Sequence, residues 1–301
     1  MKEKIHIFQP KLSWLAIPFA LIFITYFIVP LTLTLIVSFW DYTEYSIIPD
    51  FIVGNYIYIF DGCFTFKNGL TFKNGLCLTF KTYISTFFFC FFTWLITLLL
   101  GFCVAYFLAF YVNSLPLQIT LFLICTIPFW TSNVIRMVSW IPLLGRNGLV
   151  NDTLITLGLI QEPIEWLLYS SFSVILALVH LYTLFMIVPI FNSMLRIDKE
   201  VIEAAYDSGA NQFQIIKNVI IPLCKPGIII GSIFVITVVM GDFLTIGIMG
   251  GQQLASIGKI INTEMNYLQL PGAAANSVIL LFITIFIIIV MTKFIDIRKE
   301  L

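Results

Sequence analysis

The sequence predicts an all-α membrane protein with six transmembrane helices. Of its 301 residues, 60% are hydrophobic and 11% are charged, whereas soluble domains average about 45–50% apolar and about 25% charged residues. Apolar runs that are long enough for a bilayer core, which needs on the order of 20 residues per helix, recur along the chain. The strict alternation expected of barrel strands is absent, so helices are the expected way to pair the backbone within lipid.

Six apolar runs predict the individual spans. They lie near residues 14–40, 82–111, 118–142, 171–194, 227–248 and 273–294. The first run is too long for a signal-peptide core and lacks a clear small-residue cleavage site, so we expect it to be retained. Prolines at positions 18, 30, 128 and 189 predict local kinks within these spans. Residues 1–301 would then form a single transmembrane domain.

Lysine and arginine counts predict that both termini lie in the cytoplasm, because positive residues resist translocation. With the N-terminus inside, ten of these residues fall in cytoplasmic segments and five in outer ones. The cytoplasmic residues are Lys2, Lys4, Lys11, Arg196, Lys199, Lys217, Lys225, Lys293, Arg298 and Lys299. The outer residues are Lys67, Lys73, Lys81, Arg146 and Lys259. An even number of spans agrees with this orientation.

Several features exclude other classes of function. The formal net charge is zero, so the chain has no excess of positive charge that would attract a nucleic acid. Neither a G-x-x-x-x-G-K-[ST] nor a G-x-S-x-G motif occurs, and His6 and His180 are too far apart for an H-E-x-x-H metal site. We therefore expect no catalytic site, no metal and no cofactor bound by this chain.

Cysteine spacing and one repeat suggest no chemistry. The six cysteines form no C-x-x-C pair and are expected to pack as small apolar residues. The hexapeptide TFKNGL occurs twice in tandem, at 65–70 and 71–76. We interpret it as a duplication that a surface loop tolerates, because lengthening such a loop costs little closure entropy.

The polar segment 196–226, between the fourth and fifth runs, predicts two short helices on the cytoplasmic side. Asp198 is suited to cap the first helix, and Gly209 is suited to end it in a left-handed conformation. Asn211 and Gln214 form a capping-box pattern for the second helix, which we expect to stop before Pro222. The face expected on that helix consists of Phe213, Ile216 and Ile220.

The first of these helices has the composition of a docking surface. Ala204 and Ala205 are small enough for another backbone to come close, and Glu203 and Asp207, four residues apart, offer acceptors to a basic partner. An amphipathic linker lying on lipid headgroups would have a similar pattern. The residues by themselves leave both interpretations open.

The same segment resembles the EAA loop of binding-protein-dependent ABC importer permeases. Residues 203–209 read EAAYDSG and are followed by Ile221-Pro222 and Pro226-Gly227, where that loop has EAA, a glycine four residues later and a downstream Leu-Pro or Ile-Pro. Further resemblance to the spermidine/putrescine branch extends over 128–136 (PFWTSNVIR), 147–151 (NGLVN), 241–243 (GDF) and 249–251 (MGG). It covers roughly 10–295, without 61–81. Ser208 and Asp242 depart mildly, standing where leucine and glutamate are common.

This resemblance implies a permease subunit with the type I ABC importer fold, multi-pass in a bacterial inner membrane. The implied partners are a cytoplasmic ATPase dimer, which would use the ATP, a second permease subunit and a periplasmic substrate-binding protein. Segment 196–226 would be the coupling loop that docks on the ATPase. The residues implied in that coupling are Glu203, Ala204, Ala205, Asp207, Gly209 and Pro222. Polyamines such as spermidine and putrescine are the implied solutes.

Ionisable residues within spans are costly and mark candidate functional positions. Asp242 in the fifth run is suited to attract a cationic solute, and Arg136 in the third is suited to pair with it or to reach the interface. Trp130 is a candidate aromatic contact for an alkylammonium, although an interfacial anchor explains it as well. For all three residues, a place on the substrate path and a structural role stay open.

Three alternatives remain at the level of sequence. The same kind of permease could carry ferric iron, sulfate or a phosphonate. An ion-coupled secondary transporter would show inverted repeats and broken helices around a midplane site, and no convincing internal symmetry is visible. A membrane scaffold without transport would not need the EAA-like loop.

Overall fold

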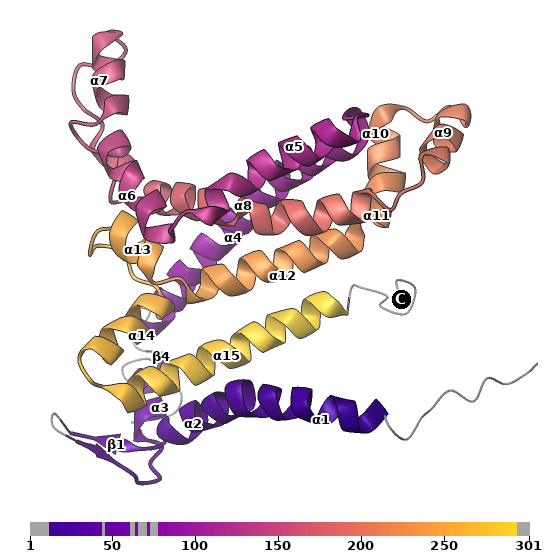
Figure 1. Cartoon of the computed structure of the whole chain (residues 1–301). Helices are drawn as coiled ribbons and strands as arrows, with labels where there is room; N and C mark the ends of the chain where they lie inside the picture. The colour runs from indigo at the N-terminus through magenta and orange to yellow at the C-terminus, as the bar shows by residue number, and fades with distance from the viewer. Residues whose placement is uncertain (1–11, 44–45, 61–63, 66–70, 73–77, 294–301) are drawn as a thin grey trace, which may run out of the picture. The chain divides into compact units, whose positions relative to one another are not determined.

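The computed structural model describes residues 12–43, 46–60, 64–65, 71–72 and 78–293, and most of them are helical (Figure 1). The chain divides into two compact units. The first consists of Met1–Lys73 with Ile261–Leu281, and the second of Asn74–Ile260 with Phe282–Leu301. The prediction that both termini are cytoplasmic falls on ends that lie outside the described residues, so it stays a prediction.

The first unit begins with one interrupted apolar helix. α1 (Leu12–Phe23), the π-helix η1 (Ile24–Ile28) and α2 (Val29–Val37) follow one another. Ile17–Val37 has the length and hydropathy to cross a membrane, and none of it is buried within the chain. Pro30 lies in the first turn of α2, directly after the π-turn. Proline disturbs the helical turn that precedes it, so the π-turn lies where a local irregularity was expected.

Hydrogen bonds of Asn55 fix the chain at the end of this first span. Its side-chain amide donates to the carbonyls of Ser38, at 2.9 Å, and Trp40, at 2.8 Å. Asn55 lies in the short helix α3 (Gly54–Ile59). The hydroxyls of Ser38 and Tyr56 lie 2.7 Å apart in the same cluster. Carbonyls that the helix end leaves without a helical partner are thereby satisfied.

Two small antiparallel hairpins are additions to the all-α prediction. β1 (Asp41–Tyr42) pairs with β2 (Ile47–Ile48), and β3 (Phe64–Thr65) pairs with β4 (Thr71–Phe72). In the second hairpin, Thr65 lies opposite Thr71, which are the first residues of the two TFKNGL copies. The other repeat residues, apart from Phe72, lie outside the described residues.

Three long helices form the core of the second unit and run side by side in Figure 1. They are α4 (Leu78–Tyr106) with the π-helix η2 (Phe107–Tyr111), α8 (Ser171–Met194) and α12 (Lys225–Gly241). Gly101 of α4 and Gly231 of α12 both pack on Met186 of α8, where an added Cβ would lie 2.8 Å from its side chain. Glycine therefore allows the close approach of these helices. α8 has the predicted bounds.

The third predicted span is broken, and the prediction of one helix over 118–142 is wrong. α5 (Leu115–Thr126) and the 3₁₀-helix η3 (Ile127–Trp130) end before α6 (Asn133–Leu144) begins. The two parts, Leu115–Trp130 and Asn133–Thr156, meet at 88°. Pro128 lies in the first turn of η3, and the Thr131 hydroxyl donates to its carbonyl at 2.8 Å. Proline and local hydroxyl bonds both oppose a continuous helix.

The fifth predicted span ends early, so the prediction of a helix over 227–248 is also wrong. α12 stops at Gly241, and α13 (Leu244–Met249) is a separate short helix. Asp242 has an extended backbone at the junction. The side chain of aspartate can hydrogen-bond to nearby backbone groups in place of the helical hydrogen bonds. Aspartate is therefore favoured at helix ends.

Outside segment 196–226, the remaining helices are α7 (Leu149–Thr156), the 3₁₀-helix η4 (Glu165–Leu167), α14 (Ile257–Asn266) and α15 (Leu270–Thr292). α15 matches the sixth predicted span. Among the described residues, four helices are long and apolar enough to cross a membrane, and six if each bent pair counts as one span. The count of six therefore stays an expectation.

Candidate functional site

Segment 196–226 lies at one end of the three core helices of the second unit, as Figure 1 shows for α9 and α10. α9 (Lys199–Asp207) starts after Asp198, whose backbone is extended as expected of a cap but whose side chain makes no capping hydrogen bond. Gly209 has a φ of +82° and no neighbouring atom within 4 Å of an added Cβ. Its backbone conformation, not space, therefore requires glycine.

The predicted capping box of the second helix is present. The Asn211 side chain accepts a hydrogen bond from the Gln214 backbone at 2.9 Å, and the Gln214 side chain accepts one from the Asn211 backbone at 2.9 Å. These two bonds satisfy backbone donors that the first helical turn leaves unpaired. The turn between α9 and α10 is thus fixed by Gly209 on one side and this box on the other.

The second helix continues through Pro222, contrary to the prediction that it stops before this residue. α10 (Gln212–Ile215) passes into the π-helix η5 (Ile216–Ile220) and then into α11 (Ile221–Leu223). Pro222 lies in the first turn of α11. The break comes at Cys224, where the segment Gln212–Leu223 meets α12 at 68°. A π-turn before the proline takes up the disturbance that would end a regular helix.

The π-turn also changes which side chains face the protein. Ile215 and Ile220, five residues apart, are both buried, whereas Phe213 is 72% exposed. The expectation that Phe213, Ile216 and Ile220 share one face is therefore wrong. That expectation assumed the spacing of an α-helix, whereas the i→i+5 pattern of a π-helix aligns residues that are five positions apart.

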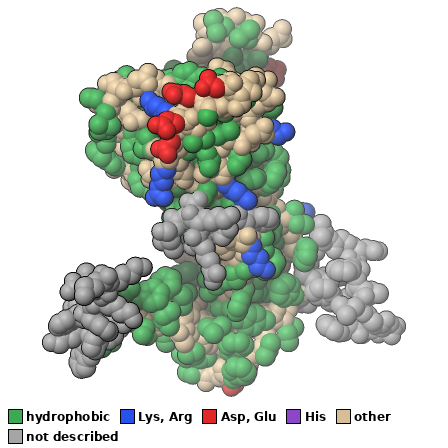
Figure 2. Space-filling view, turned by 90° about the vertical axis from the view of Figure 1, so that its right-hand side faces the viewer, with side chains coloured by type: hydrophobic (Ala, Val, Ile, Leu, Met, Phe, Trp, Pro, Cys, Tyr) green, Lys and Arg blue, Asp and Glu red, His purple; other side chains and the backbone are tan. Residues whose placement is uncertain are grey.

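The residues implied in ATPase coupling are accessible. Glu203, Ala204 and Asp207 are exposed, and Ala205 is half-buried. Figure 2 shows acidic side chains gathered on the face of the molecule that carries this segment. The acidic residues of the segment are Asp198, Glu200, Glu203 and Asp207, all of them exposed. An exposed surface of this kind offers acceptors to a basic partner.

Asp242 is a buried, fully engaged carboxylate at the junction between α12 and α13. It is 9% exposed, and its Oδ2 accepts hydrogen bonds from the hydroxyls of Tyr182 and Thr245, both at 2.6 Å. Its Oδ1 accepts from the Thr245 backbone at 2.9 Å. These bonds hold the start of α13 against α8. Tyr182 and Thr245 were not identified from the sequence, because nothing in their spacing links them to Asp242.

Arg136 is buried as well, but it makes no ion pair with Asp242. It is 8% exposed, and its Nη2 donates to Asn133 Oδ1 at 2.5 Å. Its guanidinium carbon lies 6.0 Å from the centre of the Phe129 ring. Within the described residues, its Nε has no hydrogen-bond partner. A buried guanidinium with an unused donor is costly and is suited to receive an acceptor from another molecule.

Aromatic rings surround these two groups. Phe185 packs edge-on against Phe129, with centroids 5.2 Å apart, and lies near Tyr182 and Phe234, at 6.1 and 6.3 Å. Trp130 is 78% exposed and makes no ring contact among the described residues. The structure thus brings Asp242, Arg136 and several rings to one region of the second unit. The sequence could not show this, because the rings come from three separate helices.

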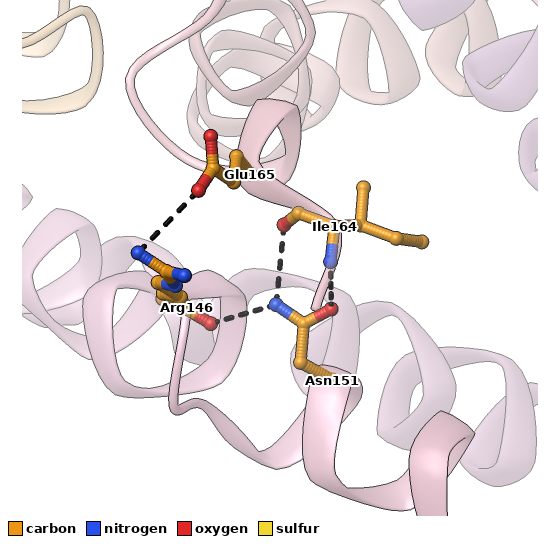
Figure 3. A network of polar contacts seen from close by, with 5 residues as sticks. Arg146, Asn151, Ile164 and Glu165 are labelled. Carbon is orange, nitrogen blue, oxygen red and sulfur yellow. Dashed lines mark hydrogen bonds and ion pairs between the residues drawn. The ribbon is translucent and has the colours of Figure 1, made fainter. Parts of the chain in front are cut away.

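The segment between α6 and α8, which includes α7, is held together by one side chain, Asn151 (Figure 3). This residue is fully buried, and its amide donates to the carbonyls of Gly145, at 3.0 Å, and Ile164, at 3.2 Å. Its Oδ1 accepts from the Ile164 backbone at 2.8 Å. Arg146 and Glu165 form an exposed ion pair beside it, 3.4 Å apart. Asn151 is the last residue of the NGLVN resemblance, and the structure gives it a definite structural role.

Comparisons with known proteins agree with the resemblance. The chain is 36% identical over 186 residues to the spermidine/putrescine transport system permease protein PotB of Escherichia coli. The aligned region covers 61% of this chain and 66% of that protein. It is 27% identical over 190 residues to the inner membrane ABC transporter permease protein YdcU of the same organism, covering 59% of each. The matches span less than two thirds of these relatives' lengths. No protein-family model matches the chain.

The fold is that of a solved bacterial alginate ABC transporter in complex with a periplasmic protein. The TM-score is 0.66 at 14% identity, over 94% of this chain and 92% of the transporter chain. The relatives found by sequence are transport permeases and not enzymes. The chain is thus similar in sequence to transport-system permeases, one of them an inner-membrane ABC permease, and similar in fold to an ABC transporter chain; several of its described helices are long and apolar enough to cross a membrane.

Proposed function

We propose that this chain is the membrane-spanning subunit of an ATP-driven importer that carries polyamines into the cytoplasm. The observation that carries the proposal is the 36% identity to a spermidine/putrescine permease, joined to an exposed EAA-like helix with a glycine-dependent turn. A separate ATPase dimer would hydrolyse the ATP, and a second permease subunit and a periplasmic binding protein would complete the assembly. This chain would bind no nucleotide, metal or other cofactor.

In this proposal, segment 196–226 transmits movement of the ATPase to the helices. The exposed face of α9, with Glu203, Ala204 and Asp207, would dock on the ATPase, and Ala205 would support it from the half-buried side. Gly209 would set the angle between α9 and α10, and Pro222 would lie in the last helical turn before the bend at Cys224. Rigid-body movement of such a docked element is a known way to switch a path between two openings.

The proposed path for the solute lies in the region of Asp242, Arg136 and Trp130. Asp242 supplies negative charge within an aromatic surrounding, which suits an ammonium group. Its hydrogen bonds to Tyr182 and Thr245 leave it little capacity for a direct contact. We therefore assign Asp242 two roles: it attracts the cationic solute through its negative charge at a distance, and it holds α13 in place. The exposed Trp130 would contact the solute directly.

A second class of solute, one with an anionic group such as a phosphonate, is favoured by Arg136. Its guanidinium is buried without a carboxylate partner within 4 Å among the described residues. Its unused Nε donor can bind an anionic acceptor, whereas an ammonium group offers only donors and repels the guanidinium. The polyamine proposal instead requires that Arg136 stay bound to Asn133 and stacked near Phe129 during transport.

The test is ATPase stimulation in the complex that copurifies with this chain. Binding protein loaded with spermidine should raise the ATPase rate, and binding protein loaded with 2-aminoethylphosphonate should not. Stimulation by the phosphonate alone would replace the polyamine with an anionic solute while keeping the importer. Failure of any nucleotide-hydrolysing subunit to copurify would reject the importer itself.

A further inference from the structure

Segment 196–226 borders an open-sided cavity of about 350 Å³ at the end of the second span. This volume lies within the range of roughly 300–1,000 Å³ typical of small-molecule sites. Its walls come from α9, from the end of α4 together with η2, and from the helix formed by α10 and η5. All of these elements belong to the second unit. The cavity is distinct from the region of Asp242 and Arg136, which no wall of it includes.

The first wall is one face of α9. Its lining residues are Lys199, Ile202, Glu203 and Tyr206, spaced three, one and three apart along the helix. This spacing places them on a single helical face. Asp207 does not line the cavity, so the two carboxylates that were expected to act together have different surroundings. The Glu203 carboxylate makes no ion pair within 4 Å and no hydrogen bond with the described residues.

The second wall is aromatic and depends on the π-turn of η2. Tyr106, Phe110 and Tyr111 line it, with the Tyr106 ring 5.3 Å from Phe110 and 5.8 Å from Tyr111. Residues four and five positions apart are brought together because the π-turn widens the helix. With Tyr206 on the opposite wall, four aromatic rings and one unpaired carboxylate face the same space.

The third wall closes the cavity with Gln212, Ile215 and Ile220. Ile215 and Ile220 are almost completely buried, so they form an apolar floor. Residues 198–207 carry four carboxylates against one lysine, so the wall that contains α9 has a net negative charge. Aromatic faces, a carboxylate and an apolar floor together match an ammonium group on a short methylene chain. Lys199 is the one basic residue among those that line the cavity, and the four carboxylates of residues 198–207 oppose the binding of a phosphate group.

We propose that this cavity binds organic amines with a primary ammonium group and a methylene chain, at a site separate from the transport path. The binding site follows from the cavity's own chemistry. Its consequence rests on the proposed function: α9 forms one wall, so an amine on the cytoplasmic side would hold the coupling helix in place and slow further import. The cavity would then act as a feedback site for accumulated amine.

The binding test uses the full chain in nanodiscs of zwitterionic phospholipid, with putrescine as the probe and equilibrium dialysis as the measurement. We expect one saturable site that the uncharged analogue 1,4-butanediol does not fill. Glu203→Gln should weaken putrescine binding by about tenfold or more, because it removes a charge-assisted contact. The matched control is Asp207→Asn, the same change one turn later and outside the cavity, which should stay within about twofold of wild type.

Three results would overturn the site: no saturable binding, equal binding of putrescine and 1,4-butanediol, or equal effects of the Glu203 and Asp207 variants. Binding lost in Asp242→Asn but kept in Glu203→Gln would place the amine on the transport path instead. That result would leave the proposed function intact. Conversely, Glu203-dependent binding in a complex that imports no polyamine would keep the site and reject the proposed function.

Discussion

At the scale of residues, the buried polar groups divide into those that are satisfied and those that are not. Asp242 uses both oxygens in bonds to Tyr182 and Thr245. The Tyr83 hydroxyl and the Arg136 Nε are buried without partners in the described part of the chain. An unpaired buried polar group lowers the free energy of unfolding, and so does removing the partner of a paired one. Conservative substitutions should therefore have opposite effects at these positions.

Tyr182→Phe should destabilise the protein by about 1–3 kcal/mol, because it removes a hydrogen bond to a buried carboxylate. Tyr83→Phe is the matched control, since it deletes a hydroxyl that has no partner, and it should leave stability unchanged or raise it. Thermal unfolding of the detergent-solubilised chain measures both. Equal losses in the two variants would show that the Asp242 contact contributes nothing specific.

Glu264 in the first unit should give stability a defined pH dependence. Both of its oxygens accept hydrogen bonds from the Asn276 amide, at 3.0 and 2.9 Å. Burial raises the pKa of Glu264, and the Asn276 bonds oppose that shift. The folded state thus holds this proton more tightly than the unfolded state. The contribution of Glu264 is present below its ordinary pKa of 4.5 and is lost as pH rises through the folded value.

Glu264→Gln keeps an acceptor for Asn276 but removes the titration. As pH rises from about 4 toward 7, wild type should lose stability relative to this variant. Unfolding midpoints measured across that range provide the comparison. A constant offset for Glu264→Gln would contradict the burial argument.

At the scale of elements, the π-turns set the orientation of the helices in and next to segment 196–226. η2 and η5 both contribute walls of the cavity next to α9. In each, residues five apart face the same way, so the helix beyond the turn is rotated relative to a regular α-helix. Patterns of three and four residues in the sequence do not reveal such a turn. This is why the face predicted for Phe213, Ile216 and Ile220 was wrong.

Deleting Asn218 from η5 should convert the π-turn to an α-helical turn. The preceding helix would then rotate by about 100° relative to α12, the angle that one residue subtends. The chain should still fold and enter the membrane, because Asn218 is exposed. Stimulation of the partner ATPase by loaded binding protein should be lost, while Asn218→Ala should keep it. Full stimulation in the deletion variant would show that the orientation of α10 is not important.

At the scale of the whole molecule, the sequence predicted the helices that are uniformly apolar, predicted only a local kink at Pro128, and missed the break at Asp242. The bounds of α8 and α15 follow closely from hydropathy, because lipid demands long apolar helices. The breaks at Thr131 and Asp242 depend on local side-chain bonds that compete with the helix, and hydropathy does not record them. The capping box at Asn211 was predictable because its partners are three residues apart. The Tyr182–Asp242 contact was not, because it joins distant segments.

We propose that the turn at Gly209 couples this chain to ATP-driven import of polyamines. The most direct measurement is ATP-dependent uptake of labelled spermidine by the complex in proteoliposomes, for wild type, Gly209→Val and Gly158→Val. Both glycines have a positive φ, +82° and +70°, with no atom within 4 Å of an added Cβ. The two variants therefore impose similar backbone strain. We expect uptake to be lost in Gly209→Val and kept in Gly158→Val; equal uptake in both, or none in wild type, would contradict the account.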